Sequence, residues 1–306
     1  MRRLIVEEPI SRAAVWSRRT AVFALATAGV AIGLSRFGVD PAAALTVFGA
    51  ALALALLAVL LASAAAVVIW RLGRRGAKEA AVAVALALAL LADPAYLTII
   101  ALRLPAINDV TTDFVSPPSF MISAKARQAR AGATLPPWSA ATGALQKAAY
   151  PEVQPILVDL EPEQAYQLAL RVAKDLGWRV VDSNPPNLRV DGVAQIEATD
   201  RTLLFGFVDD IAIRVRPLAS QTRIDIRSVS RVGRHDFGVN ARRHGCSAQS
   251  VATTPIAMQR TSQIPTIIVI RRRQLRINFI CAELRNAASI RSQSKLHAGS
   301  GNAELA

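Results

Sequence analysis

The chain has 306 residues, of which 52% are hydrophobic and only 5% aromatic, and its mean hydropathy is +0.32. This composition excludes an intrinsically disordered chain, which would lack apolar residues, and two cysteines are too few for a disulfide scaffold. The net charge of +14 divides into +5 over residues 1–102, +3 over 103–243 and +6 over 244–306. The basic excess lies mostly at the two ends, which argues against a nucleic-acid partner for the central part.

Three apolar segments predict a three-span transmembrane region over residues 1–103. Residues 41–70 carry no charge over 30 positions, where about 20 apolar residues suffice to cross a bilayer. Residues 20–35 form a shorter candidate span, for which a cleaved signal peptide is the alternative to a signal anchor. Residues 80–102 form the third span. Asp93-Pro94 interrupts this segment, but a membrane helix can be kinked by proline and still cross the bilayer.

Basic residues in the short loops predict the orientation of these spans. Five arginines lie within residues 2–19 and four basic residues within 71–78, whereas the loop between the first two spans has only Arg36, balanced by Asp40. The N-terminus and the 71–78 loop are therefore expected in the cytoplasm, and everything after Arg103 on the far side of the membrane.

Asp93 is the only acidic residue inside a predicted span. Ionisable groups within a bilayer often serve proton or ion transfer. A relay needs partners, however, and the spans contain no second acid, histidine or amide side chain. We therefore favour a carboxylate that reaches interfacial water or a neighbouring backbone at a bend.

Beyond the spans, residues 104–149 lack a clean period and are predicted to be an irregular exit loop and connector, followed by a domain over 150–243. A short strand is expected at 156–160. Pro162 and the neighbouring acids then begin an amphipathic helix, which Gly177 ends.

Short extended segments follow the helix and predict an antiparallel sheet, which together with the helix gives an α+β domain. If Ile213 and Ile226 share the apolar face, Arg214 and Asp225 oppose each other on the solvent face. The helix is expected to cover the apolar face. The expected strands are Trp178–Asp182, Leu188–Val190, Gln195–Ala198, Leu203–Val208, Ile211–Val215 and Arg223–Val229.

Three ordered motifs carry a family resemblance over about residues 107–243. They are INDVTTD at 107–113 with PPSF at 117–120, GFVDDIAIRV at 206–215, and DIRSVSRVGR at 225–234 with GVNAR at 238–242. This segment resembles the uncharacterised family called domain of unknown function 1499. The resemblance implies a bacterial envelope protein, here of the inner membrane with a periplasmic domain, and it brings no catalytic residue and no cofactor.

The chain departs from that family after Arg243, where members continue into an amphipathic helix. Residues 244–306 carry 8 basic and 2 acidic residues, both cysteines (Cys246 and Cys281) and no steady period. We expect an atypical, poorly ordered basic tail, produced by a reading-frame change or an unrelated extension.

Two groups of charged residues are candidate sites. The motif acids could converge on a hard cation, or simply order loops and strand ends. The arginines could bind an anionic lipid or a phosphorylated ligand, or form a solvated sheet face. The acids are Asp109, Asp113, Asp209 and Asp210, and the arginines are Arg214, Arg216, Arg223, Arg227, Arg231 and Arg234.

Catalysis has little support in the sequence. Ser230, His235 and Asp236 lie on one short segment and cannot generally align as a triad, and no nucleophile elbow is present. We favour a membrane-anchored, non-enzymatic module that binds a lipid, a small ligand or an envelope protein. The alternative is a hydrolase-like or cation-dependent enzyme that uses the motif Asp and Arg residues.

Overall fold

The computed structural model describes residues 9–135, 137–187 and 191–253. The chain divides into two compact units. The first, called here the helical unit, comprises Met1–Arg103 and Leu204–Phe207; the second, called the sheet unit, comprises Leu104–Leu203 and Val208–Ala306.

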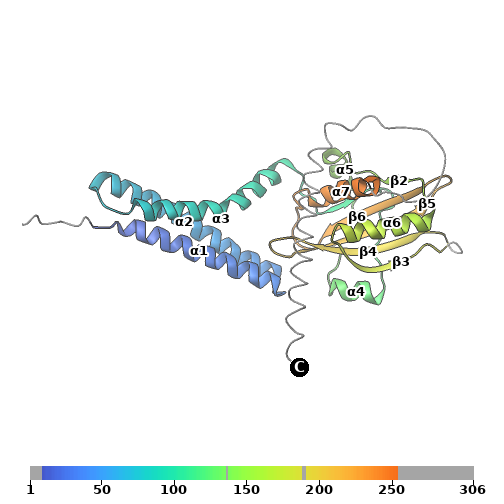
Figure 1. Cartoon of the computed structure of the whole chain (residues 1–306), viewed down its shortest axis with the longest axis horizontal. Helices are drawn as coiled ribbons and strands as arrows, with labels where there is room; N and C mark the ends of the chain where they lie inside the picture. Colours follow the sequence, from blue (N-terminus) through green and yellow to red (C-terminus); the bar gives the residue numbers. More distant parts are fainter. Residues whose placement is uncertain (1–8, 136, 188–190, 254–306) are drawn as a thin grey trace, which may run out of the picture. The chain divides into compact units, whose positions relative to one another are not determined.

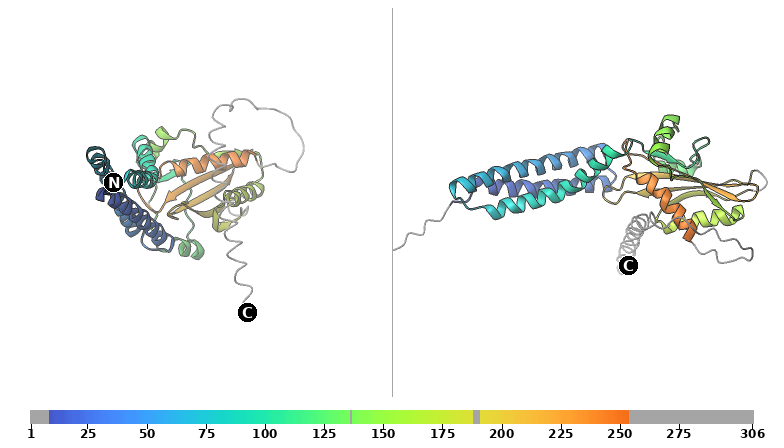
Figure 2. Two further views of the ribbon diagram at one scale, coloured as in Figure 1. Left: turned by 60° about the vertical axis from the view of Figure 1, so that its left-hand side comes forward. Right: turned by 90° about the horizontal axis from the view of Figure 1, so that it is seen from above.

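The helical unit consists of three long helices: α1 (Arg12–Arg36), α2 (Pro41–Leu72) and α3 (Ala77–Arg103) (Figure 2). At the start of α2 the Asp40 carboxylate accepts a hydrogen bond from the backbone nitrogen of Ala43 at 3.1 Å, and a proline occupies the first turn. Gly73 ends α2 with a φ of +64°, a conformation that favours glycine. The α3 helix continues through Pro94, and the Asp93 side chain is exposed.

Small residues form the buried seam of this helical unit. They recur at alternating steps of three and four, the period of a left-handed coil, and their size lets the helix backbones approach closely. Large apolar side chains such as Leu56 and Leu60 point outward instead, with 55% and 67% of their surface exposed. The seam comprises Ala14, Ser17, Ala21, Ala24, Ala28 and Ala31 of α1 and Ala51, Ala55, Ala58, Ala62 and Ala65 of α2.

Two of these helices are long and apolar enough to cross a membrane. They are α2, with a mean hydropathy of 2.9 in its most apolar window, and α3, with 2.0. The predicted span at 20–35 does lie within a helix, α1, but α1 is not one of the two candidates. Three transmembrane helices are therefore not confirmed. The N-terminal region is helical with two candidate membrane helices.

The sheet unit contains an antiparallel six-stranded sheet in the order β1-β6-β5-β4-β3, with β2 also paired to β6 (Figure 1). This architecture confirms the predicted combination of an antiparallel sheet with helices. The strands are β1 (Asp109–Thr111), β2 (Ile156–Val158), β3 (Arg179–Asn184), β4 (Ala194–Arg201), β5 (Val208–Pro217) and β6 (Thr222–Ser230). The helices are α4 (Ala124–Arg130), α5 (Ala140–Ala149), α6 (Pro162–Asp175) and α7 (Val239–Thr253).

The apolar core lies between one face of the sheet and helices α6 and α7. Alternate residues of the strands supply it, among them Ile196, Ile211 and Ile213, because side chains two apart in a strand share a face. The α6 helix begins at Pro162 and is followed by Gly177 at a φ of +77°, as the sequence indicated. The predicted pairing of Ile213 with Ile226 is confirmed.

The opposite face of the sheet is not the solvent face that we expected. Glu197, Asp225 and Arg227 lie on it and are at most 6% exposed. Residues 112–130 and Trp138 contact it, so the segment after β1 belongs to the domain and is more than a connector. Its interactions are polar and specific: the Met121 nitrogen donates to the Glu197 carboxylate at 2.7 Å, and Arg130 pairs with the same carboxylate. The spacing of apolar residues cannot predict this covering segment, because its contacts with the sheet are polar.

The strand expected at 203–208 is wrong, because β5 begins only at Val208 and Gly206 turns the chain with a φ of +71°. The strand expected at 188–190 lies outside the described residues. Residues 244–253 are not a poorly ordered tail: they belong to α7, whose Cys246 and Val251 are buried in the core. Polar residues also face inward on α7, so its sequence lacks the apolar periodicity that would predict a helix. Residues 254–306, with Cys281, lie outside the described residues.

Candidate anion-binding site

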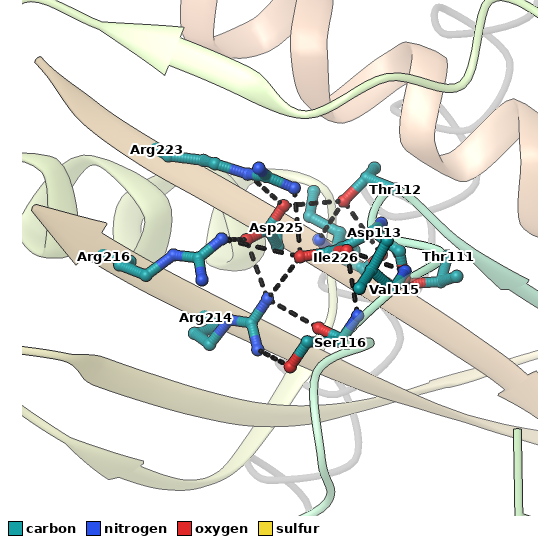
Figure 3. A network of polar contacts seen from close by, with 10 residues as sticks. All are labelled: Thr111, Thr112, Asp113, Val115, Ser116, Arg214, Arg216, Arg223, Asp225 and Ile226. Atoms are coloured by element: carbon teal, nitrogen blue, oxygen red, sulfur yellow. Dashed lines mark hydrogen bonds and ion pairs between the residues drawn. The ribbon is translucent and has the colours of Figure 1, made fainter. Parts of the chain in front are cut away.

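Three arginines surround two carboxylates on the covered face of the sheet (Figure 3), and we call these five residues the arginine cluster. Arg214 Nη2 lies 3.0 Å from Asp113 Oδ2 and 3.0 Å from Asp225 Oδ2. Arg223 is 2.8 Å from Asp225 through Nε and 3.1 Å from Asp113 through Nη2. Arg216 makes the longest contacts, 3.5 Å to each carboxylate.

Strand register brings four members of the arginine cluster together. Arg214 of β5 lies directly opposite Asp225 of β6, and Arg216 lies opposite Arg223. All four side chains point to the same face because they occupy alternate positions of paired strands. The register therefore confirms the predicted pairing of Arg214 with Asp225, although Asp225 has a side chain 0% exposed instead of lying in solvent.

The fifth member, Asp113, reaches the cluster from the chain after β1. Thr112 holds this segment on β6: its nitrogen donates to the Ile226 oxygen at 2.9 Å, and its hydroxyl accepts from the Ile226 nitrogen at 2.9 Å. The Asp113 carboxylate accepts hydrogen bonds from the nitrogens of Val115 at 3.0 Å and Ser116 at 3.1 Å. Burial alone would raise the pKa of Asp113, but these bonds and the charges of Arg223 and Arg214 lower it.

The arginine cluster holds one more positive charge than negative charge, since three guanidinium groups face two carboxylates. Arg216 is the most exposed of the three, with 33% of its side chain accessible, against 24% for Arg223 and 12% for Arg214. A guanidinium group presents several donors in a planar fork that matches carboxylate and phosphate oxygens. Arg216 is thus the group of the cluster best placed to receive an added anion.

Two of the other motif arginines, Arg227 and Arg231, are each paired with one carboxylate. Arg227 binds Asp109 through two bonds, of 3.0 and 2.7 Å, and lies over the Phe120 ring at 5.3 Å and the Trp138 ring at 5.9 Å. Burial raises the pKa of Asp109 in spite of this arginine. Arg231 binds Asp210 at 2.6 and 2.7 Å. Arg234 is exposed and belongs to neither pair.

The four candidate cation ligands do not come together. Asp209 and Asp210 are adjacent on β5 and point to opposite faces, where Asp209 accepts from Arg243 of α7 at 2.8 Å while Asp210 binds Arg231. Within the described ranges no three His, Cys, Asp or Glu side chains form a group that could hold a metal ion. Each of the four acids is instead neutralised by arginine.

Each of the three residues considered for a triad hydrogen-bonds to groups outside the triad. The Ser230 hydroxyl accepts from the Asn240 amide at 3.1 Å, and His235 accepts from the Phe237 nitrogen at 2.8 Å. The Asp236 carboxylate accepts from the Gly238 and Asn240 nitrogens, each at 2.9 Å, and so caps the start of α7. Burial raises the pKa of Asp236 despite these bonds.

Buried polar residues on both faces of the sheet were missed by sequence reasoning. Arg243 is 4% exposed and joins Asp209 to Asp200, with 2.8 and 3.0 Å contacts. Burial lowers the pKa of Arg243, but the two carboxylates more than offset this and leave it raised. Arg130 and Glu197 were also missed. No sequence signal marks them, because their partners lie far away in the chain.

The structure defines an α+β domain. Helices cover one face of its antiparallel sheet, and a segment bound by arginines covers the other. Residues 109–245 match the model of a family described as "Protein of unknown function (DUF1499)". This match confirms the resemblance over that segment, which contains all five members of the arginine cluster. No curated protein and no solved structure matches the chain.

Proposed function

We propose that the chain is a multi-pass protein of the bacterial inner membrane, with its N-terminus in the cytoplasm and the sheet unit in the periplasm. The outward-facing leucines and the small-residue seam of α1 and α2 support membrane insertion, because membrane helices pack through small residues and expose large apolar ones to lipid. The basic loops support the orientation. By this proposal α1 crosses the membrane together with α2 and α3.

The sheet unit, we propose further, is a non-enzymatic module that binds a ligand with an anionic group at the arginine cluster. The observation that carries this proposal is the surplus guanidinium group of Arg216, which is partly exposed and has only 3.5 Å contacts to carboxylates already held by other arginines. A phosphate or carboxylate oxygen could approach it to about 2.8 Å, the usual length of a charge-assisted bond. Anionic lipid is the source that we favour, since the domain is tied to the membrane.

The alternative, a hydrolase-like or cation-dependent enzyme, finds less support in this geometry. It requires carboxylates available to a water, a metal or a substrate. The acids of the GFVDD segment, Asp209 and Asp210, are each bound by an arginine side chain. A binding module has no such requirement.

Thermal unfolding of the full chain in neutral detergent micelles tests the ligand. Phosphatidylglycerol should raise the melting temperature of the wild type, because a ligand that binds only the folded state stabilises it, by about 2.7 kcal/mol at one hundred times its Kd. Phosphatidylcholine should have no such effect. Salt should weaken the shift, since the contact is electrostatic and partly exposed.

Two variants make the test specific. Arg216→Gln should lose the phosphatidylglycerol shift, and Arg179→Gln, at an exposed position of β3, should keep it. Inorganic phosphate is the second arm: an equal shift with phosphate would identify a small phosphorylated ligand as the source of the anion. Absence of a shift with both probes, or a shift retained by Arg216→Gln, would refute anion binding at this site.

A further inference from the structure

The turn between β4 and β5 contains four residues, Leu204–Phe207, that belong to the helical unit although the strands on either side belong to the sheet unit. Within the helical unit, the Phe205 ring meets the Phe48 ring edge-on, with 5.0 Å between centroids, and Phe207 stacks on Phe205 at 5.2 Å. The aromatic rings of this turn therefore pack as part of the helical unit.

Polar contacts hold the backbone of the same turn. The Ser35 hydroxyl donates to the Phe205 oxygen at 2.7 Å, and Arg36 Nε donates to the Leu204 oxygen at 3.0 Å. Gly206 has a φ of +71°, and a Cβ atom there would lie 3.1 Å from Arg36 Cδ. The last residues of α1 thus bind carbonyl groups that would otherwise need water.

Apolar side chains gather around this turn and the nearby α1–α2 connection. Leu204 has 43% of its surface exposed and Leu45, in the first turns of α2, has 41%. Phe37 and Val39, between α1 and α2, are 90% and 39% exposed. Aromatic rings, leucines and an arginine at the end of apolar helices are typical of the boundary between lipid and water.

We propose that the Leu204–Phe207 turn is embedded in the lipid–water interface, with the Leu204 side chain in contact with acyl chains. This rests on the proposed membrane insertion of α1 and α2. Lipid is the expected occupant because the turn is continuous with the outward-facing apolar surface of α2, which by that proposal faces lipid. The satisfied carbonyl groups of Leu204 and Phe205 lower the cost of moving this turn out of water.

Spin labelling of the full chain in phosphatidylcholine–phosphatidylglycerol vesicles tests the placement. A nitroxide is attached to Leu204→Cys and, in a matched control, to Leu218→Cys in the turn after β5, since the two leucines are 43% and 46% exposed. Wild-type chain labelled in parallel without reductant, so that Cys246 stays disulfide-bonded, gives the background. Collision rates are measured with oxygen, which concentrates in lipid, and with a water-soluble nickel chelate.

The label at 204 should collide severalfold more with oxygen than with nickel, and the label at 218 should show the reverse. Equal behaviour of the two labels in a chain that resists carbonate extraction would overturn the interfacial placement alone. A label at 204 that is shielded from both reagents would also overturn it, because protein would then cover the turn. A chain that carbonate extracts would overturn the membrane anchor, and with it this proposal.

Discussion

Gln146 of α5 forms both hydrogen bonds of its side-chain amide with the backbone of Thr111 in β1. Its oxygen accepts from the Thr111 nitrogen at 3.0 Å, and its nitrogen donates to the Thr111 oxygen at 2.7 Å. Both side chains are 0% exposed. Because β1 lies at the edge of the sheet, the amide takes the place of a further strand and satisfies groups that could otherwise pair with another chain.

Gln146→Leu should therefore destabilise the sheet unit. It leaves one buried N–H and one buried C=O without partners, at about 1 to 3 kcal/mol each. Hydrogen exchange of a peptide that contains Thr111 should become faster, and the melting temperature should fall. Gln154→Leu is the control, since that side chain is exposed and binds only the Pro151 oxygen. Equal exchange rates in both variants would contradict the role of Gln146.

Asp225→Asn should be strongly destabilising. On the sequence alone, the pair with Arg214 was expected in solvent, where such a pair contributes only about 0.2 to 1 kcal/mol. The structure buries the carboxylate completely among three arginines, and removal of one partner of a buried pair costs about 3 to 5 kcal/mol. Thermal unfolding compared with the exposed Asp159→Asn measures this; matching melting temperatures would rule out the buried role.

Arg227→Ala should also destabilise the fold, although a solvated sheet face was one of the two roles considered for the motif arginines. Arg227 is 6% exposed, and its loss leaves the buried Asp109 without its cation, at about 3 to 5 kcal/mol. The double variant Asp109→Leu with Arg227→Met removes both charges and should unfold at a higher temperature than Arg227→Ala. A double variant less stable than the single one would show that packing, and not the unpaired charge, dominates.

His244 should make the fold sensitive to acid. Burial, with a smaller contribution from the Arg243 charge, lowers the pKa of this histidine from 6.5 to about 3. Below pH 6.5 the unfolded chain binds a proton that the folded chain does not, so the free energy of unfolding falls as pH falls. Between pH 7.5 and 5.5 the loss is about 1.4 kcal/mol, and above pH 6.5 this contribution to stability is fully present.

Comparison with His244→Leu isolates this effect. Burial raises the pKa of Asp109, Glu197 and Asp236, so these groups favour the folded state on acidification, in the wild type and in the variant alike. The difference in stability between the two proteins should change by about 1.4 kcal/mol from pH 7.5 to 5.5. Parallel pH profiles would mean that His244 is protonated in the folded state.

Fusions to alkaline phosphatase, which is active only outside the cytoplasm, test the orientation. By the proposed topology, in which the basic 71–78 loop is cytoplasmic, a fusion after Asp113 should be active and one after Arg75 inactive. Equal protein levels of the two fusions are the control. The opposite pattern of activity would reverse the topology.

Local sequence patterns correctly predicted the elements that depend mainly on neighbouring residues. The apolar face of α6, its start at Pro162 and the pairing of Ile213 with Ile226 follow from spacing alone. The covered face could not be foreseen, because Arg214 and Asp113 lie 101 residues apart and attract each other only once the chain has folded. Conversely, residues 203–208 have the composition of a strand, but Leu204–Phe207 belong to the helical unit.

The passage of the chain from the sheet unit into the helical unit and back, at Leu204–Phe207, bears on how the protein can be dissected. A fragment that begins at Leu104 would keep this turn but lose Phe48, Ser35 and Arg36, the groups that bind it. Its leucine and phenylalanine side chains would then be presented to water at a hairpin tip, and such a fragment would tend to self-associate. Polar replacements at Leu204 and Phe205 would be needed before the sheet unit could be handled as a monomer in aqueous solution.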